Sequence, residues 1–112
     1  MKHIVYAEKP HLMGDDAADA LMEYARALAD AGRSDVVTLR ALDERGSVVD
    51  VAFLLNPGTL LLTQTTNSEI DGPDNSSVVE ELVRLASRLT HPPETQPEEA
   101  PEPQADRWET RQ

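Results

Sequence analysis

Cysteine is absent from the chain of 112 residues, which excludes a disulfide framework, a thiolate metal site and a cysteine nucleophile. Long apolar runs are absent too. The N-terminal stretch MKHIVYAEKP has too few apolar residues for a signal-peptide core, and no run approaches the roughly 18 apolar residues of a membrane span. We therefore expect a cytoplasmic protein that does not associate with membranes.

Basic residues are scarce. The chain has 10 Lys and Arg against 21 Asp and Glu, and its formal net charge is -11. Such a surplus of negative charge repels phosphate backbones and anionic lipid head groups and favours basic partners. We therefore expect no nucleic acid partner, and we expect any protein partner to be basic.

The end of the chain differs from the rest in composition. After Leu89 it is rich in proline and acidic residues and offers almost no apolar side chain to a core. This composition predicts a small α/β domain over residues 1–90 and a disordered tail over residues 91–112. The tail holds the only tryptophan, Trp108, which is either an anchor that docks on a partner or on the same chain, or incidental.

The first part of the domain predicts a strand and a helix. HIVYA, residues 3–7, is typical of a short strand, and Pro10 with Gly14 indicates a loop after it. Apolar residues at spacings of three and four predict a helix over residues 17–31. Asp15 or Asp16 would cap its start, and Gly32 stands where a left-handed residue ends a helix.

The second part predicts three strands and a second helix over residues 78–89, with Ser77 and Glu80 as a capping box. DERG, residues 43–46, and NPGT, residues 56–59, are typical of tight turns between antiparallel strands. The first turn places Val37, Leu39 and Ala41 opposite Phe53, Val51 and Val49 on one face, with Arg40 opposite Asp50 and Thr38 opposite Ala52 on the other. The second turn places Leu55 opposite Leu60, Phe53 opposite Leu62 and Ala52 opposite Thr63.

Together these elements predict an α+β fold in the order β-α-β-β-β-α. We expect a two-layer α/β sandwich in which two helices cover one face of a mainly antiparallel sheet. The other face would carry an apolar row of Val36, Leu54 and Leu61 across three strands. A contiguous exposed row marks a contact surface more often than single exposed residues do, although plain partial exposure stays open.

The loop of residues 67–75 is the main candidate for a ligand site. Asn67, Glu69, Asp71 and Gly72 stand at positions one, three, five and six of a calcium-loop pattern, but Val78 occupies the twelfth position, where a bidentate glutamate is needed. A structural loop leading to the second helix is therefore the better interpretation. The polar residues 63–66 before it are typical of the solvated end of a strand.

Catalytic patterns are lacking. His11 with Asp15 and Asp16 does not have a metal-site spacing, and no serine stands in a nucleophile-elbow context. We therefore expect no catalytic residues, no metal and no cofactor.

The order of one helix, three strands and a second helix resembles that of double-stranded RNA-binding domains. With the leading strand added, the order resembles that of ribosome-hibernation factors. Such functions require basic residues at the start of the second helix or along one face. The second helix of this chain begins NSSVVEELVR with two glutamates, and Arg40 and Arg45 do not make a basic patch. A non-enzymatic acidic protein-binding module, such as an adaptor, an inhibitor or an immunity-type protein, is the preferred hypothesis. Two alternatives are a ligand-binding domain or enzyme using the Asn67–Asn75 loop, and a self-associating structural subunit or homodimer.

Overall fold

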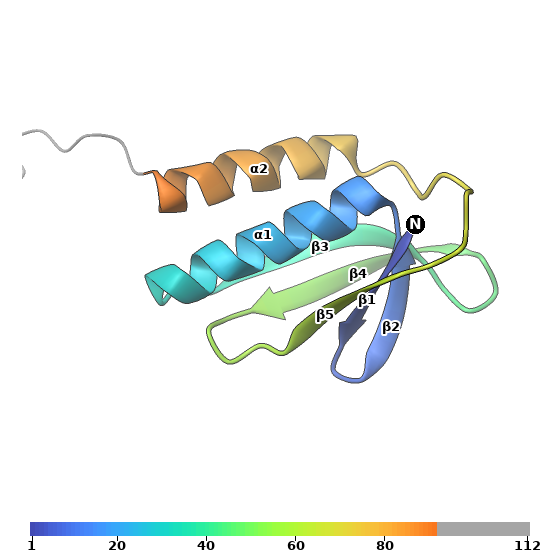
Figure 1. Ribbon diagram of the computed structural model, residues 1–112, viewed down its shortest axis with the longest axis horizontal. Coiled ribbons are helices and arrows are strands. Elements are labelled where there is room, and N and C mark those ends of the chain that lie inside the picture. Colours follow the sequence, from blue (N-terminus) through green and yellow to red (C-terminus); the bar gives the residue numbers. More distant parts are fainter. Residues whose placement is uncertain (92–112) are drawn as a thin grey trace, which may run out of the picture.

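The computed structural model describes residues 1–91 and contains one antiparallel sheet and two helices (Figure 1). The elements along the chain are β1 (Lys2–Tyr6), β2 (Lys9–Met13), α1 (Asp15–Ala31), β3 (Asp35–Leu42), β4 (Val48–Leu55), β5 (Leu61–Thr65) and α2 (Ser76–Thr90). The strands lie in the order β4-β3-β2-β1-β5. Both helices lie on one side of the sheet, and α2 packs chiefly against α1 (Figure 1). The predicted α+β class is confirmed.

The leading strand of the predicted order is a hairpin of two strands, so the loop predicted around Pro10 is wrong. The hairpin turn consists of Ala7 and Glu8, both with positive φ, at 52° and 67°. Neither is the Gly or Asn that usually marks such a turn, and this explains why the sequence pattern missed it. Pro10 fits in β2 because β2 pairs with β3 only through Leu12 and Leu42, so the N–H that proline lacks is not needed there.

The hairpin of β3 and β4 has the predicted register, including Arg40 opposite Asp50 and Val37 opposite Phe53. Its turn is closed by a hydrogen bond from the Gly46 N–H to the Asp43 carbonyl at 3.0 Å, and Gly46 has φ of 82°. The Asp43 carboxylate also accepts the N–H groups of Arg45 and Ser47. A glycine is required at this point because a side chain there would be strained.

The predicted pairing of β5 with β4 is wrong. The NPGT turn forms, with the Thr59 N–H donating to the Asn56 carbonyl at 3.0 Å, but β5 then crosses to pair with β1. In this pairing Leu61 lies opposite Tyr6 and Leu62 lies opposite Val5. β5 has the sequence LLTQT, in which the two apolar residues are adjacent, so its pattern does not specify one neighbour. The connection of residues 56–60 is long enough for the strand to leave its hairpin.

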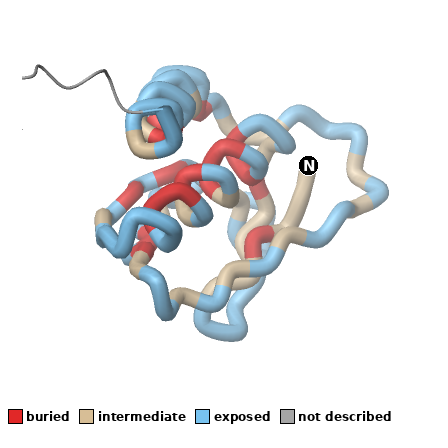
Figure 2. The backbone as a smooth tube through the Cα atoms, turned by 60° about the vertical axis from the view of Figure 1, so that its left-hand side comes forward, coloured by how far each residue is buried: buried red, intermediate tan, exposed pale blue. Residues whose placement is uncertain are grey.

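The core lies between the helices and the sheet, with many of the buried residues on α1 and others at alternate positions of β3 and at the end of β4 (Figure 2). Its largest buried side chain is Phe53, whose ring meets those of Tyr6 and His11 edge to face, with centroids 5.3 and 5.5 Å apart. α2 contributes Leu82 and Ala86.

The helix ends confirm one sequence prediction and correct two. Gly32 ends α1 in the left-handed conformation with φ of 66°, as predicted. The residues at the N-cap positions are Gly14 and Asn75, and neither makes a side-chain capping hydrogen bond. The predicted capping by Asp15 or Asp16 and the capping box of Ser77 and Glu80 are therefore wrong. Asp15 and Asp16 lie in the first turn of α1, where negative charge favours the helix dipole.

Candidate functional site

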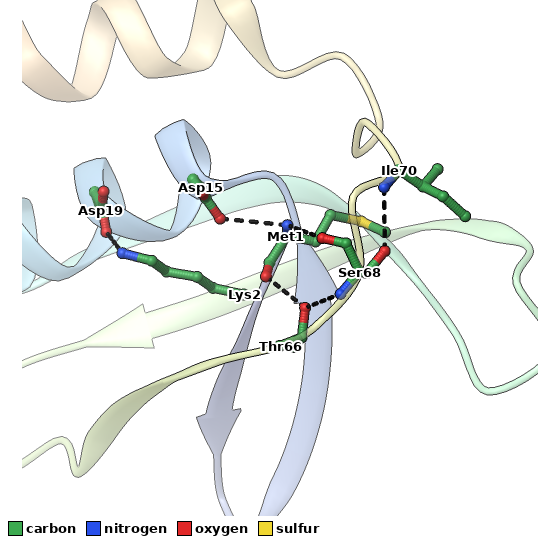
Figure 3. Close-up of polar contacts among 7 residues, drawn as sticks. All are labelled: Met1, Lys2, Asp15, Asp19, Thr66, Ser68 and Ile70. Carbon is green, nitrogen blue, oxygen red and sulfur yellow. Dashed lines mark hydrogen bonds and ion pairs between the residues drawn. The ribbon is translucent and has the colours of Figure 1, made fainter.

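The polar stretch after β5 ties the loop to the start of the chain (Figure 3). The Thr66 hydroxyl donates to the Met1 carbonyl at 2.7 Å and accepts the Ser68 N–H at 3.2 Å. The Met1 amino group donates to the Ser68 carbonyl and lies 3.4 Å from a carboxylate oxygen of Asp15. The Ser68 hydroxyl in turn accepts the Ile70 N–H. These groups are engaged with one another, so their role is to hold the loop against β1 and α1.

Asn75 lies at the end of the same loop. It is a polar residue, yet only 7% of its surface is exposed. Its amide oxygen accepts the Arg40 N–H at 2.8 Å, and its amide nitrogen donates to the Arg40 carbonyl at 2.9 Å. The side chain thus satisfies a backbone donor and acceptor of β3 as a neighbouring strand would. Sequence reasoning placed Asn75 in a ligand loop and missed this role, because the contact joins residues 35 positions apart.

The residues of the predicted calcium-loop pattern do not converge on a cation. Asn67, Glu69 and Asp71 are all exposed, and residues 1–91 contain no group of three or more His, Asp or Glu side chains placed to hold a metal ion. Gly72 has a different role, because a Cβ atom there would lie 2.5 Å from the backbone nitrogen of Gly14. The glycine allows the loop to pack directly on the chain just before α1.

A depression of about 750 Å³ lies between the starts of α1 and α2. Six acidic residues line it: Asp15, Asp16, Glu69, Asp71, Asp74 and Glu80. One of them has a clear structural role, since the Asp74 carboxylate accepts the Ser76 N–H at 2.9 Å, and this bond lowers the pKa of Asp74. Acidic side chains are favourable near helix N-termini, so the folding of the two helices accounts for much of this charge.

His11 and Tyr24 have shifted pKa values that packing explains. Burial lowers the pKa of His11, with a smaller effect from the charge of Lys9. Burial also raises the pKa of Tyr24 to about 12, and its hydroxyl donates to the Asp35 carboxylate at 2.5 Å. Each shift favours the neutral side chain inside the fold, which is what a structural role requires.

The face of β3 and β4 that points away from the helices carries exposed apolar side chains. Val36 and Leu54 lie directly opposite each other and are 59% and 50% exposed. Residues 1–91 provide no element that covers this face of the hairpin (Figure 1). The structure therefore brings together two of the predicted contact residues.

The third predicted contact residue, Leu61, is not in this row. Leu61 lies on the inner face of β5 and packs partly buried against the core, and Thr63 and Thr65 share that face. The assignment of Leu61 to the outer face was wrong because it assumed that β5 pairs with β4. Leu62, which is 54% exposed, takes the outer position. Trp108 and nearly all of the predicted tail lie outside the described residues.

Comparisons with protein-family models, curated proteins and solved structures find no match to this chain. Within residues 1–91, neither helix has the length and apolar character needed to cross a membrane.

Proposed function

We propose that this chain is a cytoplasmic, non-enzymatic module that binds a basic protein partner through the outer face of the β3–β4 hairpin. One observation carries the proposal: Val36 and Leu54 form a directly opposed, half-exposed apolar pair on a face that no element of residues 1–91 covers. Apolar side chains that adjoin one another on a sheet surface are typical of contact surfaces. They would supply the apolar centre of the interface.

The charge distribution supports different roles for the hairpin and for the acidic region around the helix starts. Residues 35–55, which form the hairpin, contain four acidic and two basic residues, so their net charge is only -2. Six acidic side chains gather instead around the depression between the helix starts. A basic partner would be attracted by this acidic region and would form its apolar contacts on the hairpin.

The experiment is affinity capture from a lysate of the source organism, with the full chain as bait. Val36→Asp places a charge in the centre of the proposed surface. Val83→Asp is the matched control, because Val83 is 57% exposed on α2. We expect the wild type and Val83→Asp to retain the same protein, Val36→Asp to lose it, and rising salt to weaken its capture. Equal capture by Val36→Asp, with an unchanged circular dichroism spectrum, would contradict the proposal.

The alternative of a ligand-binding domain or enzyme using the Asn67–Asn75 loop stays a prediction. The geometry favours it less, because Asn75, Thr66 and Ser68 are already engaged in hydrogen bonds that hold the fold. The remaining alternative, a self-associating structural subunit or homodimer, also stays a prediction.

A further inference from the structure

Hydrogen bonds of the Asn75 side chain show which N–H and carbonyl groups of β4 point to the free edge of the sheet. Asn75 binds both the N–H and the carbonyl of Arg40, so these groups point away from β4. Arg40 lies opposite Asp50, and in an antiparallel pair the two opposed residues either bond to each other or both point outward. The backbone groups of Asp50 therefore point to the free edge, and with a period of two so do those of Val48 and Ala52.

Two further contacts agree with this direction. The Tyr6 hydroxyl accepts the Leu54 N–H at 3.3 Å and donates to the Leu54 carbonyl at 3.1 Å, which closes the edge at that end. Val36, opposite Leu54, donates its N–H to its neighbour Asp35 rather than to β4. Within residues 1–91, β4 ends the sheet, and no protein group bonds the outward N–H and carbonyl groups of Val48, Asp50 and Ala52.

This open edge lacks the usual protection against pairing. β4 has the sequence VVDVAFLL, with Asp50 as its one charged residue and with no lysine or proline. The edge at the other end of the sheet, β5, is shorter and ends in Thr63, Gln64 and Thr65. Natural edge strands are commonly blocked by charge, proline or short length, because a long apolar edge is a template for another strand.

We infer that the β4 edge pairs antiparallel with the β4 edge of a second copy of this chain, with Val51 opposite Val51 at the twofold axis. The outward backbone groups of one copy must bond the outward backbone groups of the other, so even-numbered residues of β4 pair with even-numbered residues. The allowed registers are therefore centred on successive residues of β4. A register centred on Asp50 sets two carboxylates opposite each other, and like charges in that position are destabilising.

The registers centred on Val49 and Ala52 place Asp50 opposite Val48 and Leu54 of the second copy, respectively. The register centred on Val51 avoids both contacts, because it places Asp50 opposite the small Ala52.

The inferred register also makes the exposed apolar residues self-complementary. The backbone hydrogen bonds between the copies join Asp50 and Ala52, because Tyr6 already bonds the N–H and the carbonyl of Leu54. The side chain of Leu54 in one copy still lies opposite that of Val48 in the other. The outer face thereby gains a row of Val36, Leu54, Val48 and Leu42 across four strands. Val48 is 58% exposed in the single chain, and Val49, on the inner side, comes opposite Phe53. An isologous contact requires this kind of complementarity between a strand and its own copy.

Charge permits a second copy here more readily than elsewhere on the chain. Residues 1–91 contain 15 acidic and eight basic residues, for a net charge of -7, whereas the hairpin of residues 35–55 carries only -2 of it. Each Asp50 also keeps Arg40 beside it on β3. The inference concerns the strand edge and stands independently of a partner on the outer face.

Single cysteines test the register, because the chain has none of its own. In the inferred register, Val51→Cys places two sulfurs in a non-hydrogen-bonded pair with Cα atoms about 4.5 Å apart, which a disulfide can bridge. Val49→Cys is the matched control on the same strand and face, and its copies lie four residues out of register, too far apart to bridge. Under mild oxidation we expect a covalent dimer of Val51→Cys and none of Val49→Cys. Equal cross-linking of both variants, or of neither, would overturn the register.

Proline tests the edge without relying on a disulfide. Ala52→Pro removes an outward N–H that bonds nothing in the single chain, so the domain should fold, whereas pairing with a second copy should be blocked. Light scattering with size exclusion should give the full wild-type chain twice its mass of 12.3 kDa and Ala52→Pro the single mass. A wild-type monomer at every concentration, or a dimer that persists in a folded Ala52→Pro, would overturn the inference.

Discussion

The side-chain amide of Asn75 forms two hydrogen bonds with the backbone of Arg40, at 2.8 and 2.9 Å. The amide thereby replaces a missing strand at a point where β2 and β3 have separated, since these strands pair only through Leu12 and Leu42. This contact anchors the loop of residues 66–75 and the start of α2 to the sheet. It also shows which backbone groups of β3 and β4 face outward.

Replacement of Asn75 by alanine should lower the free energy of unfolding by about 2–3 kcal/mol, because it leaves a backbone donor and acceptor unsatisfied in a partly buried site. Asn75→Asp should also be destabilising, since a carboxylate accepts the Arg40 N–H but cannot donate to its carbonyl. Asn67→Ala is the control, because Asn67 is exposed in the same loop. Urea denaturation measures all three variants, and an Asn75→Ala variant as stable as Asn67→Ala would disprove this role.

Gly72 and Gly14 should respond differently to the same substitution, although they contact each other. A Cβ atom at Gly72 would lie 2.5 Å from a backbone nitrogen, whereas the nearest atom to a Cβ at Gly14 is 4.0 Å away. We expect Gly72→Ala to cost about 1–3 kcal/mol through overpacking. Gly14→Ala should cost less than about 1 kcal/mol, as for an N-cap position. Thermal unfolding of the two variants checks the order, and the reverse order would contradict the packing described for the loop.

Stability should depend on pH through His11. Because burial lowers the pKa of His11 in the folded chain, the unfolded chain binds the proton more readily. The stabilising contribution should be fully present above the ordinary pKa of about 6.5 and should be lost as pH falls from there toward the lowered folded value. Chemical denaturation between about pH 5.5 and 7.5 avoids most carboxylate titration. Over this range the free energy of unfolding of the wild type should rise with pH, and that of His11→Asn should rise less steeply. Identical slopes would exclude His11 as the source of this rise.

The β3–β4 hairpin was predictable in register because its signals are local. Gly46 follows Asp43 at the spacing of a tight turn, and the apolar and charged residues on either side then match in pairs, down to Arg40 opposite Asp50. The two exposed contact residues Val36 and Leu54 followed from this register. Turn geometry and the apolar pattern together specify the register of such a hairpin.

The position of β5 was not predictable in this way. The pairing of Leu61 with Tyr6 joins residues far apart along the chain, and no turn residue specifies it. The error moved Leu61 to the wrong face and hid the fact that β4 is an edge strand. The role of Asn75 was hidden for the same reason, since its partner Arg40 is distant in sequence.

Amide hydrogen exchange along the chain tests most directly whether the β3–β4 hairpin is the interaction surface. The full chain would be measured free at high dilution and again in complex with the partner that it captures. We predict slower exchange in the complex at Val36 and along β4, residues 48–54, with little change in the loop of residues 66–75. Slower exchange confined to that loop, with β4 unchanged, would contradict the account and favour the ligand-loop alternative.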